Sequence, residues 1–368
     1  MVKLPQKNTL VHQAAAFLRE RIAQGAWEEW LPGERMLEQM LQVSRGTVRA
    51  ALVQLRKDGI IATEESVGNR IVRHGGRKKG GSIDSDAGLL VCGELYRFQH
   101  LPMGIFWIDH LRAMLAERGS RLHVHDGRIY ARRNPGPALK KLMRTHPHRC
   151  WILLKSSEGA QAWFQKNAVP CILVGTPHAG IDLPYCDIDY RAVCRHATGL
   201  LLRRGHRRIA LLIKHSRLAG DIQSEAGFSE AFARLDRADA PPVICHHDGT
   251  PEGVAAAVRR LMAQKQPPTA LLVAYPHHYL TVASCLGKLG FDVPRDVSLI
   301  LRDYEPCLDW LLPRVSCYAF NVRAQARKLL DAITPALNGG PPPGRTHIIM
   351  PEFSEGGSIA PPPPPACV

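Results

Sequence analysis

Hydrophobic residues near the N-terminus recur at the spacing of an α-helix in three successive segments, residues 10–24, 32–41 and 45–57. The side chains expected on the three buried faces are Val11, Ala15, Leu18 and Ile22, then Met36, Leu37, Met40 and Leu41, then Val48, Ala51, Leu52 and Leu55. Pro32 and Gly33 open the second segment, where a proline sacrifices no helical hydrogen bond. We therefore predict three short helices.

Polar residues around the third helix predict a helix-turn-helix. Ser44 stands at the N-cap position, where its hydroxyl can accept the amide of Thr47. Gly59 suits the left-handed residue that follows a helix. The face opposite the apolar one begins with Arg45, Thr47 and Arg49. These donors lie at the end of the helix that meets base edges in the major groove.

A short hairpin is predicted directly after this helix. Residues 60–64 have the composition of a strand, residues 66–69 (Ser-Val-Gly-Asn) suit a hairpin turn, and residues 70–72 return as a second strand. Gly68 marks the expected tip, because glycine permits a positive φ and a close backbone approach to DNA. Such a hairpin is a wing, and with the three helices it makes a winged helix.

The phrases IAQGAW, LPGER and VSRGTVRAAL resemble the GntR family of bacterial transcription regulators, over residues 10–72. The resemblance implies that the arginine of LPGER, Arg35, also reaches the major groove. The residues expected to contact DNA are Arg35, Ser44, Arg45, Gly46, Thr47, Arg49, Gly68 and Asn69. An ordinary three-helix packing unit is the structural alternative.

From residue 88 onward, buried strands alternate with amphipathic helices, one of them expected at residues 227–235. The apolar runs include GLLVCGEL, WILL, VPCILVG, IALLI, TALLVA and DVSLIL, and THIIMPEF suggests a final strand. Strands that alternate with helices of about 10–15 residues predict parallel sheets with right-handed crossovers. We therefore predict an α/β fold of two lobes with a cleft between them.

Several phrases in this region resemble the LacI-type effector domain, which shares its fold with periplasmic sugar-binding proteins. They are LLLRRGHRRIALLI, GFSEAF and KLGFDVPRDVSLIL, and the resemblance covers residues 88–359. A GntR-type head on a LacI-type body is the arrangement of arabinose-repressor-type regulators. The resemblance implies a sugar-like effector in the cleft and places Asp303 on the acidic residue of the family pattern.

Two departures from the family pattern bear on the effector. Ser224 stands where the family has an arginine that grips sugar hydroxyls, and Tyr275-Pro276 replaces an Asn-Asp pair. Other candidates fall at strand ends and early loops, where ligands of open α/β sheets bind. The candidate effector residues are Asp303, Asp221, Tyr275, Ser224, Asp189, Arg217 and Trp107. For Asp303 the alternative is a plain turn aspartate.

Composition narrows the class of protein. The 368 residues carry a formal net charge of +15, which favours an acidic polymer as partner. Residues 1–79 hold fourteen Lys/Arg and eight Asp/Glu, a net of +6. The ten cysteines include no Cys-x-x-Cys and the histidines no HExxH, so we expect small buried thiols and no metal site. The pairs His246-His247 and His277-His278 are expected to point apart on strands.

The domain organisation follows from these patterns. Residues 1–73 are expected to be a winged helix-turn-helix DNA-binding domain, and residues 74–87 a flexible glycine-rich linker. Residues 88–353 are expected to bind the effector and dimerise, and residues 354–368 to form a proline-rich disordered tail. No apolar run reaches the ~18 residues of a membrane span, and no signal peptide is recognisable, so a cytoplasmic location is expected.

The favoured interpretation is a ligand-controlled transcription regulator of a sugar operon, for which repression is the commoner expectation. We expect a homodimer on a palindromic operator, because one recognition helix covers too few bases for useful specificity. Two alternatives remain, an architectural DNA binder whose body only dimerises, and a DNA-binding head fused to an enzyme such as a pyridoxal-phosphate protein. No GxSxG, GxxxxGK[ST] or GxGxxG occurs, so no catalytic residue, cofactor or metal is predicted.

Overall fold

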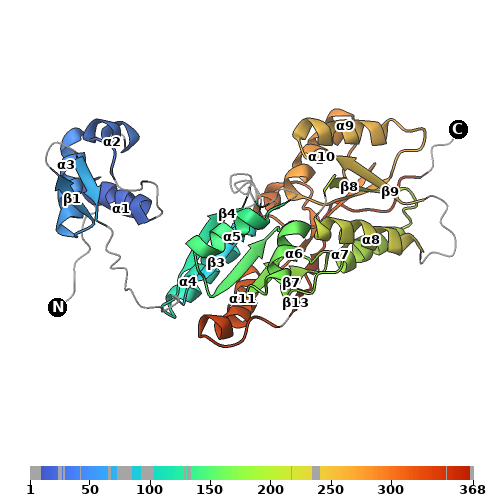
Figure 1. The fold of residues 1–368 in the computed structure, drawn as a ribbon. Helices are drawn as coiled ribbons and strands as arrows, with labels where there is room; N and C mark the ends of the chain where they lie inside the picture. Colours follow the sequence, from blue (N-terminus) through green and yellow to red (C-terminus); the bar gives the residue numbers. More distant parts are fainter. Residues whose placement is uncertain are drawn as a thin grey trace, which may run out of the picture. The chain divides into compact units, whose positions relative to one another are not determined.

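The chain divides into two compact units, Met1–Ser82 and Ile83–Val368, which we call the head and the body and describe separately (Figure 1). The computed structural model describes residues 10–23, 27, 30–41, 43–64, 68–72, 85–92, 103–127, 130, 134–216, 218–233, 241–344 and 346–364.

The head consists of three helices and a two-stranded antiparallel sheet. Its elements are α1 (Leu10–Ala23), α2 (Glu34–Leu41), α3 (Arg45–Lys57), β1 (Ile61–Glu64) and β2 (Gly68–Ile71). The apolar faces of α1 and α3 meet in a core that contains Leu18, Leu52 and Leu55, each without exposed surface. Ile61 pairs with Ile71 in the hairpin, and both side chains belong to this core. The winged-helix prediction is confirmed.

Two details of the predicted head are wrong. Met36 and Met40 are 62% and 41% exposed, so of the four residues predicted to form the buried face of α2 only Leu37 is fully buried. Met36 and Met40 lie beside Leu37 on the helix surface, but the elements that pack against α2 cover only the part of its face around Leu37. Gly68 and Asn69 belong to β2 and pair with Glu64 and Thr63, so they follow the hairpin turn instead of forming it.

The first lobe of the body is a six-stranded sheet of order β13-β7-β6-β5-β3-β4, with every neighbouring pair parallel. Its strands are β3 (Ala87–Val91), β4 (Leu122–Asp126), β5 (Cys150–Leu154), β6 (Cys171–Val174), β7 (Tyr185–Ile188) and β13 (His347–Ile349). Helices α4 (Met103–Ala116) and α11 (Val322–Leu337) pack together on this sheet. Helices α5 (Gly136–Thr145) and α6 (Glu158–Lys166) share a second apolar cluster with it, around Trp151 and Phe164.

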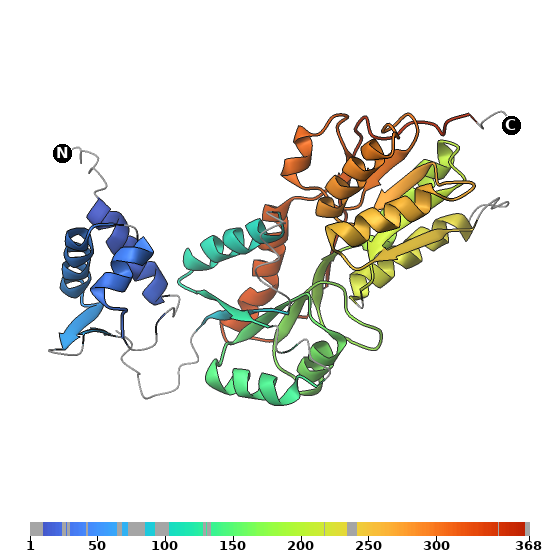
Figure 2. The same ribbon diagram turned by 90° about the horizontal axis from the view of Figure 1, so that it is seen from above.

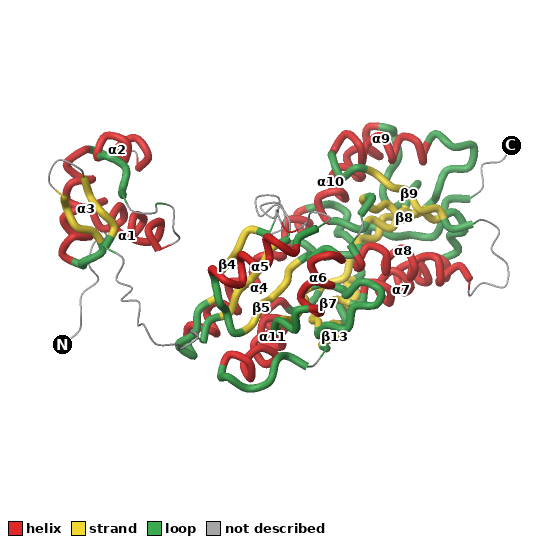
Figure 3. The backbone as a smooth tube through the Cα atoms, in the orientation of Figure 1, coloured by secondary structure: helices red, strands yellow, loops and turns green. Residues whose placement is uncertain are grey.

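The second lobe is a six-stranded sheet of order β14-β12-β11-β10-β8-β9, parallel except for β14. Its strands are β8 (Ile209–Lys214), β9 (Val243–His247), β10 (Ala270–Val273), β11 (Ser298–Leu301), β12 (Ser316–Ala319) and β14 (Glu352–Ser354). Helices α7 (Tyr190–Arg203) and α8 (Ala219–Ala233) pack into one apolar cluster, and α9 (Pro251–Met262) and α10 (Pro276–Lys288) into another. A short 3-10 helix, η3 (Pro306–Trp310), follows β11. Figure 3 shows the strands of each lobe with helices around them.

The chain passes between the two lobes three times, from β7 to α7, from β12 to α11 and from β13 to β14. Figure 2 shows the consequence, because α11 lies among elements of the first lobe although it follows the second lobe in sequence. The two-lobed α/β prediction is confirmed. The pattern missed the four-residue strands β7 and β12 and the helix α11, and α8 begins eight residues before the predicted Gly227.

The C-terminal segment departs from the prediction in two ways. THIIMPEF contains two strands in different sheets, since β13 joins the first lobe and β14 the second. The predicted disordered tail is wrong for residues 354–360, which pack along the second sheet. Ser358 is fully buried, and its Oγ accepts the amide of Ser316 at 2.8 Å and donates to the carbonyl of Leu299 at 2.7 Å. These bonds satisfy backbone groups that would otherwise be unpaired.

The histidine and cysteine expectations are tested directly. His246 is exposed and His247 buried on β9, as predicted for neighbours on a strand. His277 and His278 lie instead in the first turn of helix α10, and their ring centroids are 4.1 Å apart. Eight of the nine described cysteines are buried, and Cys307 is exposed. Among the described residues, no group of three or more His, Cys, Asp or Glu side chains could hold a metal ion, and no helix could cross a membrane.

Candidate functional site

The recognition helix α3 begins at a capped N-terminus. Ser44 has extended backbone angles, and its Oγ accepts the amide of Thr47 at 3.3 Å, as predicted. The two hydroxyls of these residues lie 2.9 Å apart. Because the cap satisfies one of the free amides at the helix start, the first turn is held in place and its exposed side chains share one defined face.

Two of the predicted arginines share one carboxylate that sequence reasoning missed. Arg45 Nε and Arg49 Nε donate to Glu34 Oε2 at 3.0 and 2.9 Å, from the first turn of α2 to the first turns of α3. Their hydrogen bonds hold the pKa of Glu34 below its usual range. Both arginine side chains remain about 60% exposed, at 60% and 59%. The acidic residue next to Arg35 in LPGER was the available signal.

The other predicted head residues lie on the same α3 end, on α2 or on the wing. Arg35 and Gly46 are exposed, and a Cβ at Gly46 would meet no atom closer than 3.8 Å. Gly68 has a φ of +138°, a conformation that other residues rarely adopt. The Asn69 carbonyl accepts the amide of Leu31 at 2.9 Å, which ties the wing to the loop before α2.

A cavity of about 190 Å³ lies in the body, between the carboxyl ends of strands from both lobes. Four predicted effector residues line it, namely Trp107, Asp221, Tyr275 and Asp303. Trp107 is only 3% exposed and contributes an apolar wall together with Phe320. The prediction that Asp303 falls in a cleft at a strand end therefore agrees with the structure.

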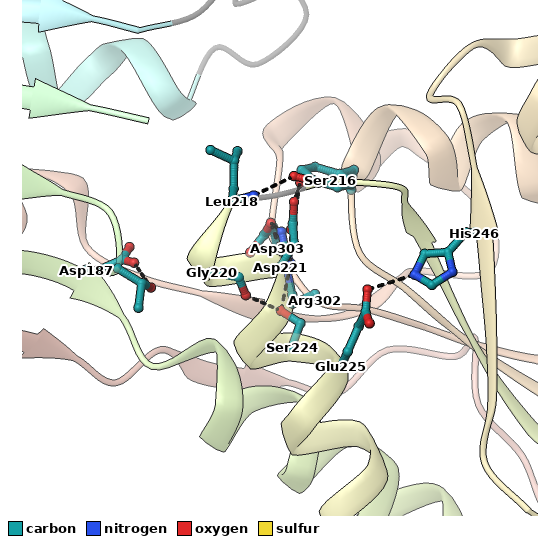
Figure 4. Close-up of polar contacts among 12 residues, drawn as sticks. Asp187, Ser216, Leu218, Gly220, Asp221, Ser224, Glu225, His246, Arg302 and Asp303 are labelled. Atoms are coloured by element: carbon teal, nitrogen blue, oxygen red, sulfur yellow. Dashed lines mark hydrogen bonds and ion pairs between the residues drawn. The ribbon is translucent and has the colours of Figure 1, made fainter. Parts of the chain in front are cut away.

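Arg302 organises the second-lobe side of this cavity, and sequence reasoning missed it. Its Nη1 donates to Asp221 Oδ1 at 3.1 Å and to Ser224 Oγ at 2.9 Å, and its Nη2 donates to Asp303 Oδ2 at 2.9 Å (Figure 4). The side chain is 3% exposed. Burial opposes the charge, but the two carboxylates more than offset this, so the pKa of Arg302 stays well above its ordinary value.

Two tyrosines complete this arrangement. The guanidinium carbon of Arg302 lies 4.2 Å from the ring centre of Tyr190 and 4.8 Å from that of Tyr275, so the cation is stacked between aromatic faces. The Tyr275 hydroxyl donates to Asp221, with oxygens at 2.6 and 2.7 Å. Both carboxylates proposed to grip an effector thus already have partners within the protein.

The first-lobe side of the cavity carries different polar groups. Asp187, at the end of β7, is 9% exposed, and its Oδ2 accepts the hydroxyl of Thr176 at 2.6 Å. Burial raises the pKa of Asp187 to about 6. Lys155 has a left-handed φ of 51° at the end of β5, and burial lowers its pKa, partly offset by Asp221 and Asp303. Figure 4 shows Asp187 apart from the Arg302 group.

The remaining predicted effector residues are not in the cavity lining. Asp189 caps α7, where its Oδ1 accepts the amide of Ala192 at 2.8 Å, so the structure gives it a local role. Ser224 is not in the lining, and it bonds to two residues that are, since its Oγ accepts from Arg302 Nη1 at 2.9 Å and donates to the Gly220 carbonyl at 2.9 Å. Arg217 lies outside the described residues. Apart from its place at a strand end beside Asp303, nothing in the sequence pattern marked Arg302.

Comparison with known families assigns both units. Residues 10–71 match the bacterial regulatory proteins of the gntR family, and residues 198–359 match the periplasmic binding protein-like domain. The chain joins a GntR-family head to a LacI-type body. The first match describes a family of regulatory proteins and the second a binding-protein-like domain.

Curated relatives are regulators of similar kind at low identity. The chain is 27% identical to the HTH-type transcriptional regulator reg1 of Streptomyces lividans over 199 residues, 53% of this chain and 57% of that protein. It is 29% identical to AglR of Rhizobium meliloti over 140 residues, 37% and 38% of the two chains. The match to the repressor CytR of Escherichia coli K12 is 26% over 136 residues, 37% and 40%. The chain thus spans about half the length of these relatives or less.

Solved structures share the fold. The CelR–cellobiose complex has a TM-score of 0.65 at 18% identity, covering 96% of this chain and all (100%) of that one. A LacI family transcriptional regulator from Bifidobacterium animalis subsp. lactis has a TM-score of 0.65 at 22% identity, covering 76% and 100%. At these identities the likeness concerns the fold of the regulator and not its ligand.

Proposed function

We propose that this regulator represses a sugar-utilisation operon and releases its operator when a sugar enters the body cavity. It acts in the cytoplasm as a homodimer on a palindromic operator, with a DNA-binding domain at residues 1–73, a linker at 74–87 and an effector domain from residue 88. Sugar binding changes operator affinity because the two binding events are linked through one protein.

The DNA side of the proposal rests on the exposed arginines of the head. Arg45 and Arg49 start the recognition helix, and Arg35 lies exposed on α2. A guanidinium can pair with both acceptors of a guanine in the major groove. Ser44, Gly46 and Thr47 belong to the same helix start, and Gly68 and Asn69 begin the returning strand of the wing. We propose backbone or phosphate contacts for these five residues.

The single observation that carries the effector side is the cavity between the two lobes. It combines aromatic walls (Trp107, Tyr190, Tyr275) with buried carboxylates, the combination that suits a small polar molecule with apolar faces. The solved CelR–cellobiose complex shares this fold, and we propose a sugar for this chain by that analogy.

The test combines two measurements on the full chain. A panel of neutral sugars, with cellobiose, maltose, glucose and arabinose among them, is screened for a rise in Tm, since a ligand of the folded state stabilises it. Any sugar that raises Tm is then titrated into the operator complex, and release of DNA is expected. If no sugar raises Tm, or if one does and the DNA stays bound, the proposal is wrong.

One observation favours a second candidate function. Asp221 and Asp303 already bond to Arg302 and Tyr275, so the polar centre of the cavity is satisfied without a ligand. A body that serves only to dimerise, in a protein with an architectural DNA-binding head, would also have its polar cavity groups satisfied in this way. Failure of every sugar in the Tm screen, with intact operator binding, would favour this second function.

A further inference from the structure

One buried side chain in the cavity has an unused acceptor. Gln325 is the fourth residue of α11 in the first lobe, is 5% exposed and lines the cavity. Its Oε1 is buried and has no hydrogen-bond partner among the described residues. Burying an amide oxygen without a partner costs free energy, because folding removes its hydrogen bonds to water and forms no hydrogen bond in their place.

A second glutamine in the same cavity shows that the unpaired state is specific to Gln325. Gln161 of α6 is 2% exposed and also lines the cavity. Its Oε1 accepts the amide of His178 at 2.9 Å, and its Nε2 donates to Ser156 Oγ at 3.1 Å. The fold therefore satisfies one cavity glutamine fully and leaves an acceptor of the other open.

We propose that Gln325 Oε1 binds the effector by accepting a hydrogen bond from one of its hydroxyl or amino groups. The inference rests on the proposed function and deepens it. On the second-lobe side, Arg302 and Tyr275 already occupy Asp221 and Asp303. The open acceptor lies on the first-lobe side, so the donor groups of the effector are held by that lobe.

The charges around the cavity define the class of ligand. Four carboxyl side chains line it, and two cationic side chains oppose them; they are Asp187, Asp221, Asp303 and Glu305, against Lys155 and Arg302. Arg302 is engaged by two of these carboxylates. A phosphate or carboxylate on the ligand would bring a further negative charge next to acceptors at low dielectric. The effector is therefore an uncharged polyhydroxylated molecule or one that carries an amine, and not a sugar phosphate or sugar acid.

The test uses the full chain with Gln325→Met, which keeps the length of the side chain and removes the acceptor. Gln161→Met is the matched control. Without ligand, Gln325→Met should melt at or above the wild-type temperature, because an unpaired acceptor is lost, while Gln161→Met should melt lower, because paired groups are stranded. The Kd of the sugar selected by the Tm screen should rise about ten- to a hundredfold in Gln325→Met, measured by calorimetry.

The outcomes distinguish a failure of the role proposed for Gln325 from a failure of the proposed sugar response. A wild-type protein that no neutral sugar stabilises overturns both. A wild-type response with an unchanged Kd in Gln325→Met overturns only the role of Gln325, as does a ligand-free Tm that falls as far as in Gln161→Met. Glucose 6-phosphate is compared with glucose on the wild type, and tighter binding of the phosphate overturns the ligand class.

Discussion

The head and the body each contain a cluster of ion pairs built around one side chain, with opposite charge and opposite exposure. In the head, the carboxylate of Glu34 holds Arg45 and Arg49, whose side chains are 60% and 59% exposed. In the body, the guanidinium of Arg302 holds Asp221 and Asp303, and its own side chain is 3% exposed. Each cluster has three members joined at distances near 3 Å.

The difference lies in what water can do for each cluster. Around Glu34, water replaces any broken contact, so such pairs contribute little to stability and can be exchanged for a DNA partner. Around Arg302, burial limits the access of water, so removing the guanidinium leaves Asp303 without its ion pair and Asp221 with the Tyr275 hydroxyl alone. The exposed cluster is suited to binding a polyanion, and the buried one to fixing the shape of a cavity.

Arg302→Met should have the largest effect on stability. It leaves the buried Asp221 and the half-buried Asp303 without their cation, so we expect the free energy of unfolding to fall by about 3–5 kcal/mol. Urea unfolding of the full chain, followed by tryptophan fluorescence, measures it. Arg295→Met is the control, because Arg295 makes ion pairs at a 71% exposed position. Equal losses in the two variants would remove the contrast between buried and exposed clusters.

Asp187→Asn tests a buried carboxyl outside the Arg302 cluster. Burial raises the pKa of Asp187 from 3.8 to about 6, so its neutral form stabilises the fold below pH 3.8 and this contribution is lost as pH rises through 6. The Asn variant should therefore be more stable than wild type by up to about 3 kcal/mol at pH 7.5. The gap should shrink towards pH 4.5 in paired urea titrations, and a constant gap would contradict the assignment.

Arg45→Ala should reduce sequence discrimination instead of stability. A bidentate arginine–guanine contact contributes ~1–3 kcal/mol of preference for the right base, and the variant should lose that much between operator and scrambled DNA. Competition gel shifts measure the ratio. Arg56→Ala is the control on the same helix, since Arg56 lies near its C-terminal end. Equal discrimination by wild type and Arg45→Ala would show that Arg45 reads no base.

Glu34→Gln should have the smallest effect on folding, under about 1 kcal/mol, because its partners are exposed. Binding to scrambled DNA should strengthen, since a negative charge next to two arginines is lost. The operator preference should fall, because the arginines lose the carboxylate that aligns them. Glu38→Gln, on the same helix, controls for charge alone, and identical behaviour of both variants would rule out alignment.

The head could be predicted because its sequence signals involve residues that are close together along the chain. The N-cap at Ser44, the left-handed Gly59 (φ +69°) and the apolar spacing of Val48 to Leu55 all involve residues within one helix, and all were confirmed. The wrong prediction that Met36 and Met40 are buried also came from a short-range pattern. Spacing shows which residues share a face, but the partner helix decides how wide a face is covered.

The body was predictable as a class of fold and less so in its connections. Buried runs such as IALLI became the central strands, since a strand covered on both faces must be apolar throughout. Strands β7 and β12 have four residues each and carry polar side chains such as Asp187 and Ser316, so no periodic signal distinguished them from loops. The tail at residues 354–360 is ordered by hydrogen bonds to β11 and β12, which no composition could reveal.

The sequence by itself determined the two kinds of domain, because helix periodicity, caps and apolar strands depend on neighbours along the chain. It also placed Asp221, Tyr275 and Asp303 near a cavity, since parallel strands bring their carboxyl ends to one edge. Only the tertiary structure decided which side chains of the cavity bond to one another. Arg302 meets Asp221 across 81 positions of sequence, and Gln325 lines the first-lobe side of the same cavity, where its Oε1 has no hydrogen-bond partner among the described residues. Such contacts depend on how distant segments pack, and no local pattern encodes them.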